Sequence, residues 1–189
     1  MKRRSLFAAL LAMLVPALAV AQVPGATPTP DPMVYDDPAI HFQAPSGWYP
    51  VGQRRIKPDD LGSNPEAVAG WVNSSTGRVE SLVLQLQSFS GSLDDFETTY
   101  EQEMRQEFSG TFIKNKERTS LANGMPAYYM EMTTGEGFTT TKAFIVIWID
   151  GVRGVALVVN GPLDNISANV AKAIMRKAKA TQYPLGRDY

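Results

Sequence analysis

Few residues in this chain could carry out chemistry. It contains one histidine, His41, and no cysteine. Without cysteine it can form no disulfide and hold no metal through thiolates, and a single histidine excludes the paired ligands of typical zinc enzymes. His41 lies between Ile40 and Phe42, and this alternation predicts a surface imidazole on an edge strand rather than a lone ligand or general base.

Carboxylates are the other candidates for acid–base chemistry, and they occur as three adjacent pairs, Asp36-Asp37, Asp59-Asp60 and Asp94-Asp95. A glycosidase needs two carboxylates that face each other across a cleft, and adjacency in sequence does not indicate one. A hydrolase that uses loop-borne Asp and Glu side chains is the alternative function. It would require a cleft with a carboxylate of raised pKa.

Glutamates line one face of a predicted helix, at Glu97, Glu101, Glu103 and Glu107. They could bind a cation, but the Asp-rich loop of a calcium site is absent, and we expect a solvated face. Gly135-Glu136-Gly137 predicts a hairpin turn rather than a phosphate-binding loop, which would need a following helix. Nucleophile-elbow, P-loop, dinucleotide and H-E-x-x-H motifs are also absent. We therefore predict no catalytic residue, no cofactor and no metal.

Large aromatic side chains are the more useful candidates for a contact site, although core packing is the favoured explanation for them. They are Trp48, Tyr49, Trp71, Tyr128, Tyr129 and Trp148. In a strand, Tyr128 and Tyr129 must point to opposite faces, so one of them is covered by a second layer or exposed for contact.

Residues 1–21 have the three parts of a secretory signal peptide. Lys2, Arg3 and Arg4 precede an apolar run at 6–18, and Ala19-Val20-Ala21 predicts cleavage before Gln22. The run is too short to span a bilayer stably, so we expect no membrane insertion after cleavage. Sec export is favoured over the twin-arginine route, and an uncleaved anchor is the other alternative. We expect a periplasmic or secreted protein.

Composition bounds the partners of the processed chain. Residues 1–21 contain three of the 18 basic residues and no acidic one, so the remainder carries 15 Lys and Arg against 19 Asp and Glu, a net charge of −4. This charge argues against a nucleic-acid partner. Four prolines in residues 22–36 predict a flexible tether at 22–37, followed by a single domain at 38–182 and a loose tail at 183–189. Asn73 and Asn165 begin glycosylation patterns that matter only in a eukaryote.

Periodicity predicts mainly strands. We expect short strands at 40–43 and 53–57, a hairpin of 67–72 with 79–89, and a meander of 111–121, 125–133, 138–149 and 155–159. In the second hairpin strand, alternate leucines predict one buried face. Residues 143–149 and 155–159 are apolar in both phases, so they should be central strands that are covered on both sides.

Two helices complete the predicted fold. Ser92 can cap a helix whose apolar residues recur every four positions, from Phe96 to Phe108, until Gly110. Gly161-Pro162 should end the sheet, and the last helix should follow it over 163–178, with Lys172 and Arg176 in the half that complements the helix dipole. The predicted class is α+β, an antiparallel sheet of about six strands sandwiched between helices.

Motifs in this order resemble the PsbP-like proteins, which include the bacterial DcrB type and small exported mycobacterial relatives. The motifs are F-x-A-P-x-G-W at Phe42–Trp48, S-L-D-D-F at Ser92–Phe96, N-G-M-P-A-Y-Y at Asn123–Tyr129, and Asp150-Gly151. The resemblance covers residues 38–182 and implies a PsbP-like α/β/α sandwich with no shared catalytic residue. It implies a non-enzymatic binding or accessory protein of the cell envelope, which uses a sheet face or a loop edge to bind a protein or small ligand. A structural subunit of an envelope complex is a further alternative.

Overall fold

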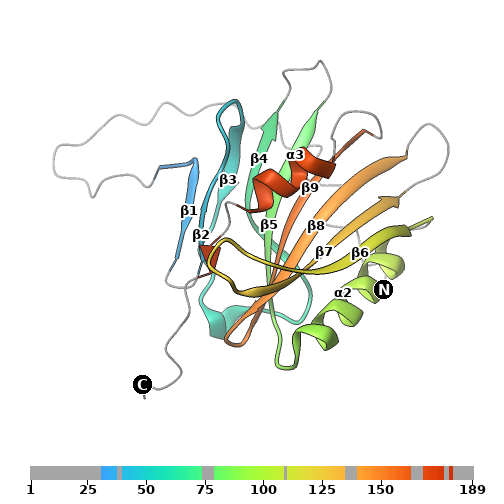
Figure 1. The fold of residues 1–189 in the computed structure, drawn as a ribbon. Coiled ribbons are helices and arrows are strands. Elements are labelled where there is room, and N and C mark those ends of the chain that lie inside the picture. The colour runs from blue at the N-terminus through green and yellow to red at the C-terminus, as the bar shows by residue number, and fades with distance from the viewer. Residues whose placement is uncertain are drawn as a thin grey trace, which may run out of the picture. The chain divides into compact units, whose positions relative to one another are not determined.

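The computed structural model of this protein describes residues 31–37, 40–73, 79–108, 110–134, 140–162, 168–176 and 179–180. Seven strands form one antiparallel sheet (Figure 1), in the spatial order β3 (Tyr49–Gln53), β4 (Glu66–Asn73), β5 (Glu80–Ser88), β9 (Arg153–Pro162), β8 (Thr141–Asp150), β7 (Pro126–Thr134) and β6 (Phe112–Ser120). A smaller sheet has the order β1 (Val34–Asp36), β2 (Ile40–Gln43) and β10 (Lys179–Ala180). The helical elements are η1 (Pro58–Asp60), α2 (Leu93–Glu107) and α3 (Ala168–Met175). The predicted α+β class is confirmed.

Two hydrophobic layers lie on opposite faces of the large sheet. On one face, α3 and the small sheet cover alternate residues of the central strands, including Leu84, Val146 and Leu157. On the other face, α2 covers the intervening residues, including Ile145 and Val158. Because both faces of β8 and β9 are buried, these strands are apolar in both phases, as the sequence predicts. Each layer removes apolar surface from water, which is the main force holding the sheet and helices together.

Helix α2 begins directly after its capping residue, Ser92. The Ser92 hydroxyl accepts from the Asp95 amide, and the Asp95 carboxylate accepts from the Ser92 amide, so two amides at the helix start are satisfied. The apolar face packs through Phe96, Tyr100 and Met104, as predicted. Gly154 of β9 makes this packing possible, because a Cβ atom there would overlap the ring of Phe96.

Strand β5 differs from its prediction. Its leucines are buried, as expected, in the layer that includes α3. Gln85 and Gln87 are also buried, on the face that α2 covers. The Tyr100 hydroxyl donates to the Gln85 side-chain oxygen at 2.8 Å, and the Gln87 side-chain amide donates to the Ser63 carbonyl at 3.2 Å. Hydrogen bonds of this kind offset the cost of burying amide groups. The glutamines of β5 can therefore be buried, although polar residues at alternate positions usually indicate an exposed face.

The predicted tether, residues 22–37, is wrong over its last seven residues. Residues 1–30 lie outside the described part of the chain, but Val34–Asp36 form β1, and Tyr35 is fully buried. The Trp71 indole N–H donates to the Pro32 carbonyl at 3.0 Å, and the Gln53 amide donates to the same oxygen at 2.7 Å. Proline supplies no amide donor, but its carbonyl accepts from both side chains and holds the segment on the sheet.

His41 is a surface residue, as expected, but it does not lie on an edge strand. Strand β2 is the middle strand of the small sheet, and the exposed imidazole lies 3.1 Å from an Asp36 carboxylate oxygen on β1. The strand predicted at 53–57 is also wrong, because pairing with β4 occupies Tyr49–Gln53 instead. Gly161 and Pro162 do not end the sheet but form the end of β9.

The last helix is described over Ala168–Met175, within the predicted span. Several expectations lie outside the described residues: the signal peptide, the turn at 135–137, the start of the last helix at 163–167 and the tail at 183–189. Within the described ranges, no helix combines the length and the hydropathy needed to cross a membrane.

Candidate functional site

The three aspartate pairs do not meet in one place. Asp36 is on the small sheet, Asp59 and Asp60 are exposed on η1, and Asp94 and Asp95 begin α2. Asp94 accepts a hydrogen bond from the Tyr128 hydroxyl at 2.8 Å, and Asp95 caps the helix. Each pair therefore has a local structural role or is solvated, rather than facing a second pair.

Asp37 instead forms a buried cluster with two residues of the β8–β9 hairpin. Arg153 donates to Asp37 at 3.1 Å and to Asp150 at 2.6 Å, and all three side chains are more than nine-tenths buried. Burial raises the pKa of the Asp150 carboxyl, while the hydrogen bond from Arg153 opposes that shift. Because Arg153 lies against both carboxylates, the cluster holds the small sheet on the large one and offers no free acid and base.

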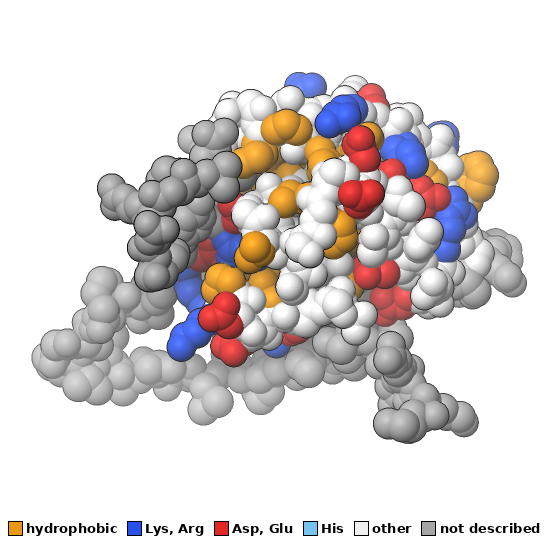
Figure 2. All heavy atoms as spheres, turned by 90° about the horizontal axis from the view of Figure 1, so that it is seen from below, with side chains coloured by type: hydrophobic (Ala, Val, Ile, Leu, Met, Phe, Trp, Pro, Cys, Tyr) orange, Lys and Arg blue, Asp and Glu red, His pale blue; other side chains and the backbone are white. Residues whose placement is uncertain are grey.

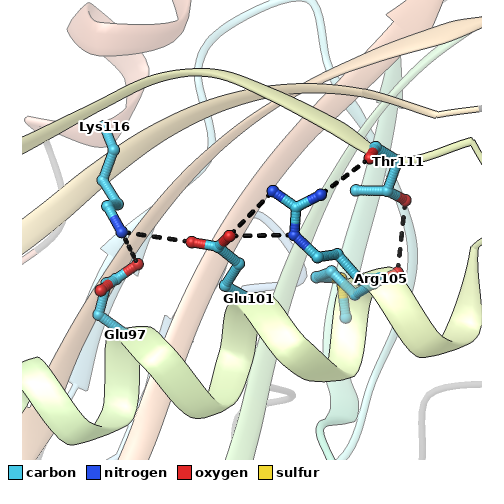
Figure 3. A network of polar contacts seen from close by, with 6 residues as sticks. Glu97, Glu101, Arg105, Thr111 and Lys116 are labelled. Atoms are coloured by element: carbon cyan, nitrogen blue, oxygen red, sulfur yellow. Dashed lines mark hydrogen bonds and ion pairs between the residues drawn. The ribbon is translucent and has the colours of Figure 1, made fainter.

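The glutamate face of α2 is only partly the solvated surface that the sequence predicts, because Glu107 is exposed whereas Glu101 and Glu103 are half-buried. Glu97 is buried, and Lys116 of β6 lies 2.8 Å from one of its oxygens and 3.3 Å from Glu101. Arg105 lies 2.9 Å from Glu101 and donates to the Thr111 carbonyl, so acids and bases alternate along the helix, as Figure 3 shows.

The alternation sets the electrostatics of this face. Burial alone would raise the pKa of Glu101, but hydrogen bonds from Arg105 and Lys116 hold it below its ordinary value. Each carboxylate in the network faces a cation, so the network joins α2 to β6 and does not form a cation site. Within the described ranges, no group of three or more His, Asp and Glu side chains could hold a metal ion.

A pocket beside α3 is the best candidate for a functional site. It encloses about 30 Å³ and lies between α3 and strands β6, β7 and β8. We call it the α3 pocket. Its lining residues are Glu117, Thr119, Ser120, Leu121, Tyr129, Val146, Lys172, Met175 and Arg176.

Tyr129 lines the α3 pocket with a buried side chain. Its side chain is 3% exposed and its ring stacks on Phe144, with 6.3 Å between centroids. The hydroxyl finds no hydrogen-bond partner among the residues that the structure describes. Burial, followed by the charges of Glu131 and Glu117, raises the pKa of Tyr129, so the phenol remains a neutral O–H donor. Tyr128 points to the opposite face, as strand geometry predicts.

Two cations line the same pocket, Lys172 of α3 and Arg176 directly after it. The Lys172 ammonium lies 4.5 Å from the centroid of the Tyr129 ring and 2.5 Å from a Glu117 oxygen. Arg176 follows one turn later, still in helical hydrogen bonding to the Lys172 carbonyl, and is exposed. It forms no ion pair with any described residue. The α3 pocket therefore has one available cation at its rim, Arg176, which suits a partner group that accepts hydrogen bonds.

The sequence indicated some of this site but not the site itself. Tyr129 is one of the aromatic candidates, whereas the helix dipole is a sufficient explanation for Lys172 and Arg176 in the sequence. Their spacing of four residues places them on one face of α3, which was an available signal. Nothing in the sequence placed Glu117, Thr119 and Ser120 opposite that helix, because tertiary packing alone brings β6 there.

Comparisons with known proteins agree with this fold. No protein-family model and no curated protein sequence matches the chain. Among solved structures, it is similar to cyanobacterial PsbP (CyanoP) from Synechocystis sp. PCC 6803, at 14% identity and a TM-score of 0.55, over 78% of this chain and 91% of that one. It is also similar to LpqN of Mycobacterium tuberculosis, which is involved in cell envelope biogenesis, at 14% identity and a TM-score of 0.51, over 77% and 86% of the two chains. The fold is therefore PsbP-like, as the sequence resemblance implied, and the DcrB type stays a prediction.

Proposed function

We propose that this chain is an exported, non-enzymatic accessory protein of the cell envelope, and that it binds a partner protein at the α3 pocket. The observation that carries the proposal is the exposed side chain of Arg176, which lines the α3 pocket and forms no ion pair with any described residue. A guanidinium at the rim of a pocket can bind a carboxylate or a carbonyl oxygen of a partner protein.

The size of the pocket favours a protein over a small molecule. Sites for small ligands usually enclose about 300–1,000 Å³, whereas the α3 pocket encloses about 30 Å³. That is room for a group about the size of one water molecule. A guest that inserts one polar group must gain the rest of its affinity from the surrounding surface, as a protein partner does.

The charges of the molecule also support a protein partner. Figure 2 shows acidic, basic and hydrophobic side chains interspersed on the face seen from below, without a continuous basic field. Nucleic-acid binding requires clustered Lys and Arg side chains that displace counterions, and the processed chain is acidic overall.

The arrangement of carboxylates supports a non-enzymatic role over the hydrolase alternative. The pKa of Asp150 is raised by burial, as a catalytic acid would require, but Arg153 is bonded to it and to Asp37. The α3 pocket is lined by a single carboxylate, Glu117, whereas glycoside hydrolysis uses two.

Export is the part of the proposal that rests on residues 1–21, with their basic start, apolar run and Ala19-Val20-Ala21 site. Expression of the full chain followed by fractionation and mass spectrometry tests it. We expect a mature protein that begins at Gln22 in the envelope or medium. A chain that keeps Met1 and stays in the cytoplasm would contradict export.

Affinity capture tests the binding role. The full chain, tagged at its C terminus, is expressed in its native host as the wild type, as Arg176→Glu and as Lys57→Glu. The last is a matched control, because Lys57 is an exposed cation that does not line the α3 pocket. We expect one fixed partner with the wild type and with Lys57→Glu, and its loss with Arg176→Glu. Equal recovery of the same proteins with all three, or hydrolysis of a substrate panel that depends on one carboxylate, would contradict the proposal.

A further inference from the structure

We propose that Asp150 is a proton-binding site, and that the proton it takes up strengthens the attachment of the small sheet to the large one. The attachment weakens as the pH rises and the proton is lost. The site is the buried cluster of Asp37, Arg153 and Asp150, none of which lines the α3 pocket.

The cluster contains two carboxylates and one cation. The side chains of Asp37, Arg153 and Asp150 are all more than nine-tenths buried, and Arg153 donates to Asp37 at 3.1 Å and to Asp150 at 2.6 Å. With both carboxylates ionised, one negative charge has no cation of its own. An unpaired buried charge is costly, and a buried acid avoids this cost by remaining protonated. One proton from solvent leaves the cluster neutral.

The hydrogen bonds around the two aspartates indicate which of them takes the proton. Asp37 accepts from the Ile40 amide at 2.9 Å and from the Tyr35 hydroxyl at 3.3 Å, in addition to Arg153. Such donors favour the ionised form of a carboxyl group. Among the described residues, Arg153 alone donates to the Asp150 carboxyl group. The proton therefore belongs on Asp150.

The charged groups that face Asp150 support this assignment. Burial, which is the largest effect, and the negative charge of Asp37 raise the pKa of Asp150 against the hydrogen bond and charge of Arg153. Arg55 is exposed and lies over the Tyr35 ring, 5.5 Å from its centroid, so solvent screens its charge. Burial also raises the pKa of Tyr35 to about 12, so its hydroxyl remains a neutral donor.

The two aspartates belong to different sheets, and this couples the proton to the contact between the sheets. Asp37 directly follows β1, and its amide donates to the Ile40 carbonyl of β2 at 3.0 Å. Asp150 and Arg153 are the facing ends of β8 and β9. When the small sheet detaches, Asp150 is hydrated and no longer faces Asp37, so its pKa returns to the ordinary value of about 3.9. The attached state therefore binds the proton more tightly than the detached state.

This difference between the two states gives the direction of the pH dependence. Below about pH 4, Asp150 is protonated in both states, and the attachment has its full strength. As the pH rises toward the pKa of the attached state, the detached state loses its proton first, so the attachment weakens. Above that pKa, Asp150 is ionised in both states and the attachment weakens no further.

Carbon-13 NMR of the side-chain carboxyl groups tests the proton site in the processed full-length protein. The Asp150 signal is assigned by through-bond correlation and followed from about pH 3 to about pH 8, a range that covers the ordinary titration of aspartate. Asp59, an exposed aspartate of η1, is the internal reference. We expect Asp150 to titrate at a higher pH than Asp59.

Hydrogen exchange of the β2 amides (Ile40–Gln43) measures detachment of the small sheet. Their protection factors should fall as the pH rises above about 4, tenfold for each unit by which the pKa of the attached state is raised. Asp150→Asn keeps a neutral acceptor for Arg153 and should hold the high protection at every pH. Asp59→Asn, the matched control, should follow the wild type. Both variants keep the exposed His41–Asp36 pair of the small sheet, so that pair cannot explain a difference between them.

Three results would overturn the proposal: an Asp150 signal that titrates together with that of Asp59, protection of β2 in the wild type that does not change above about pH 4, or an unchanged pH dependence in Asp150→Asn. Circular dichroism shows whether the variants are folded. If Asp150→Asn does not fold, the NMR titration and the exchange of the wild type decide the question, because neither requires a variant.

Discussion

Replacing Tyr129 with phenylalanine should make the free protein more stable. The change removes a hydroxyl that is buried and has no hydrogen-bond partner among the described residues. It keeps the ring that stacks on Phe144 and that lies under the Lys172 ammonium. Truncating a large buried side chain usually destabilises a protein. An increase in the free energy of unfolding would therefore indicate that the removed hydroxyl was unsatisfied.

The magnitude follows from the desolvation of the hydroxyl. An unsatisfied buried polar group costs about 1–3 kcal/mol. The substitution removes this cost, but the small void left by the missing oxygen offsets part of the gain. We therefore expect the free energy of unfolding to rise by about 1 kcal/mol. For a domain of this size, that corresponds to an increase of about 2–4 °C in Tm.

Urea unfolding at pH 7, followed by tryptophan fluorescence, measures the change, and Tyr100→Phe is the matched control. Tyr100 is also fully buried, but its hydroxyl donates to Gln85 at 2.8 Å. Removing it leaves the Gln85 oxygen unsatisfied, so this variant should lose about 1–3 kcal/mol. If Tyr129→Phe loses stability as Tyr100→Phe does, the Tyr129 hydroxyl has a partner in the folded protein, and our account of the α3 pocket is wrong.

Three further variants test the fold and its charges. Burial raises the pKa of Glu103 above its unfolded value, so its ionised form destabilises the fold; Glu103→Gln should raise the urea midpoint at pH 7, with the difference vanishing below about pH 4, whereas a constant difference would exclude titration as the cause. Arg153→Met leaves two buried aspartates without their cation and should cost about 3–5 kcal/mol in urea unfolding; a cost below 1 kcal/mol would mean that water reaches the cluster. Gly154→Ala forces a methyl group onto the Phe96 ring and should cost about 1–3 kcal/mol, and an unchanged Tm would show that the ring moves freely.

Local patterns predicted most of the large sheet and α2. Strand β8 is apolar in both phases because α2 and α3 cover its two faces, and this pattern is visible in sequence. Ser92 and Asp95 indicate the start of α2, because a capping box uses residues three positions apart. Features that depend on neighbours within a few residues were therefore predictable.

Features that depend on distant segments were not predictable from these patterns. Arg153 reaches Asp37 across 116 residues of sequence, so a proline-rich segment that resembled a tether is held on the domain. Glu97 is buried because Lys116 of another element neutralises it, and no helix periodicity reveals that partner. The α3 pocket is formed by the packing of α3 against β6 and β7. The sequence can indicate single residues of the pocket but not that they lie together.

The small sheet has a consequence for the order of folding. Lys179 and Ala180 of β10 pair with His41 and Ile40 of β2, which joins the two ends of the domain. Pairings of such high sequence separation form slowly, because loop-closure entropy is lost before the contacts are gained. The small sheet can close only after Lys179 and Ala180 have left the ribosome, so the domain cannot complete its fold while earlier residues are still being synthesised.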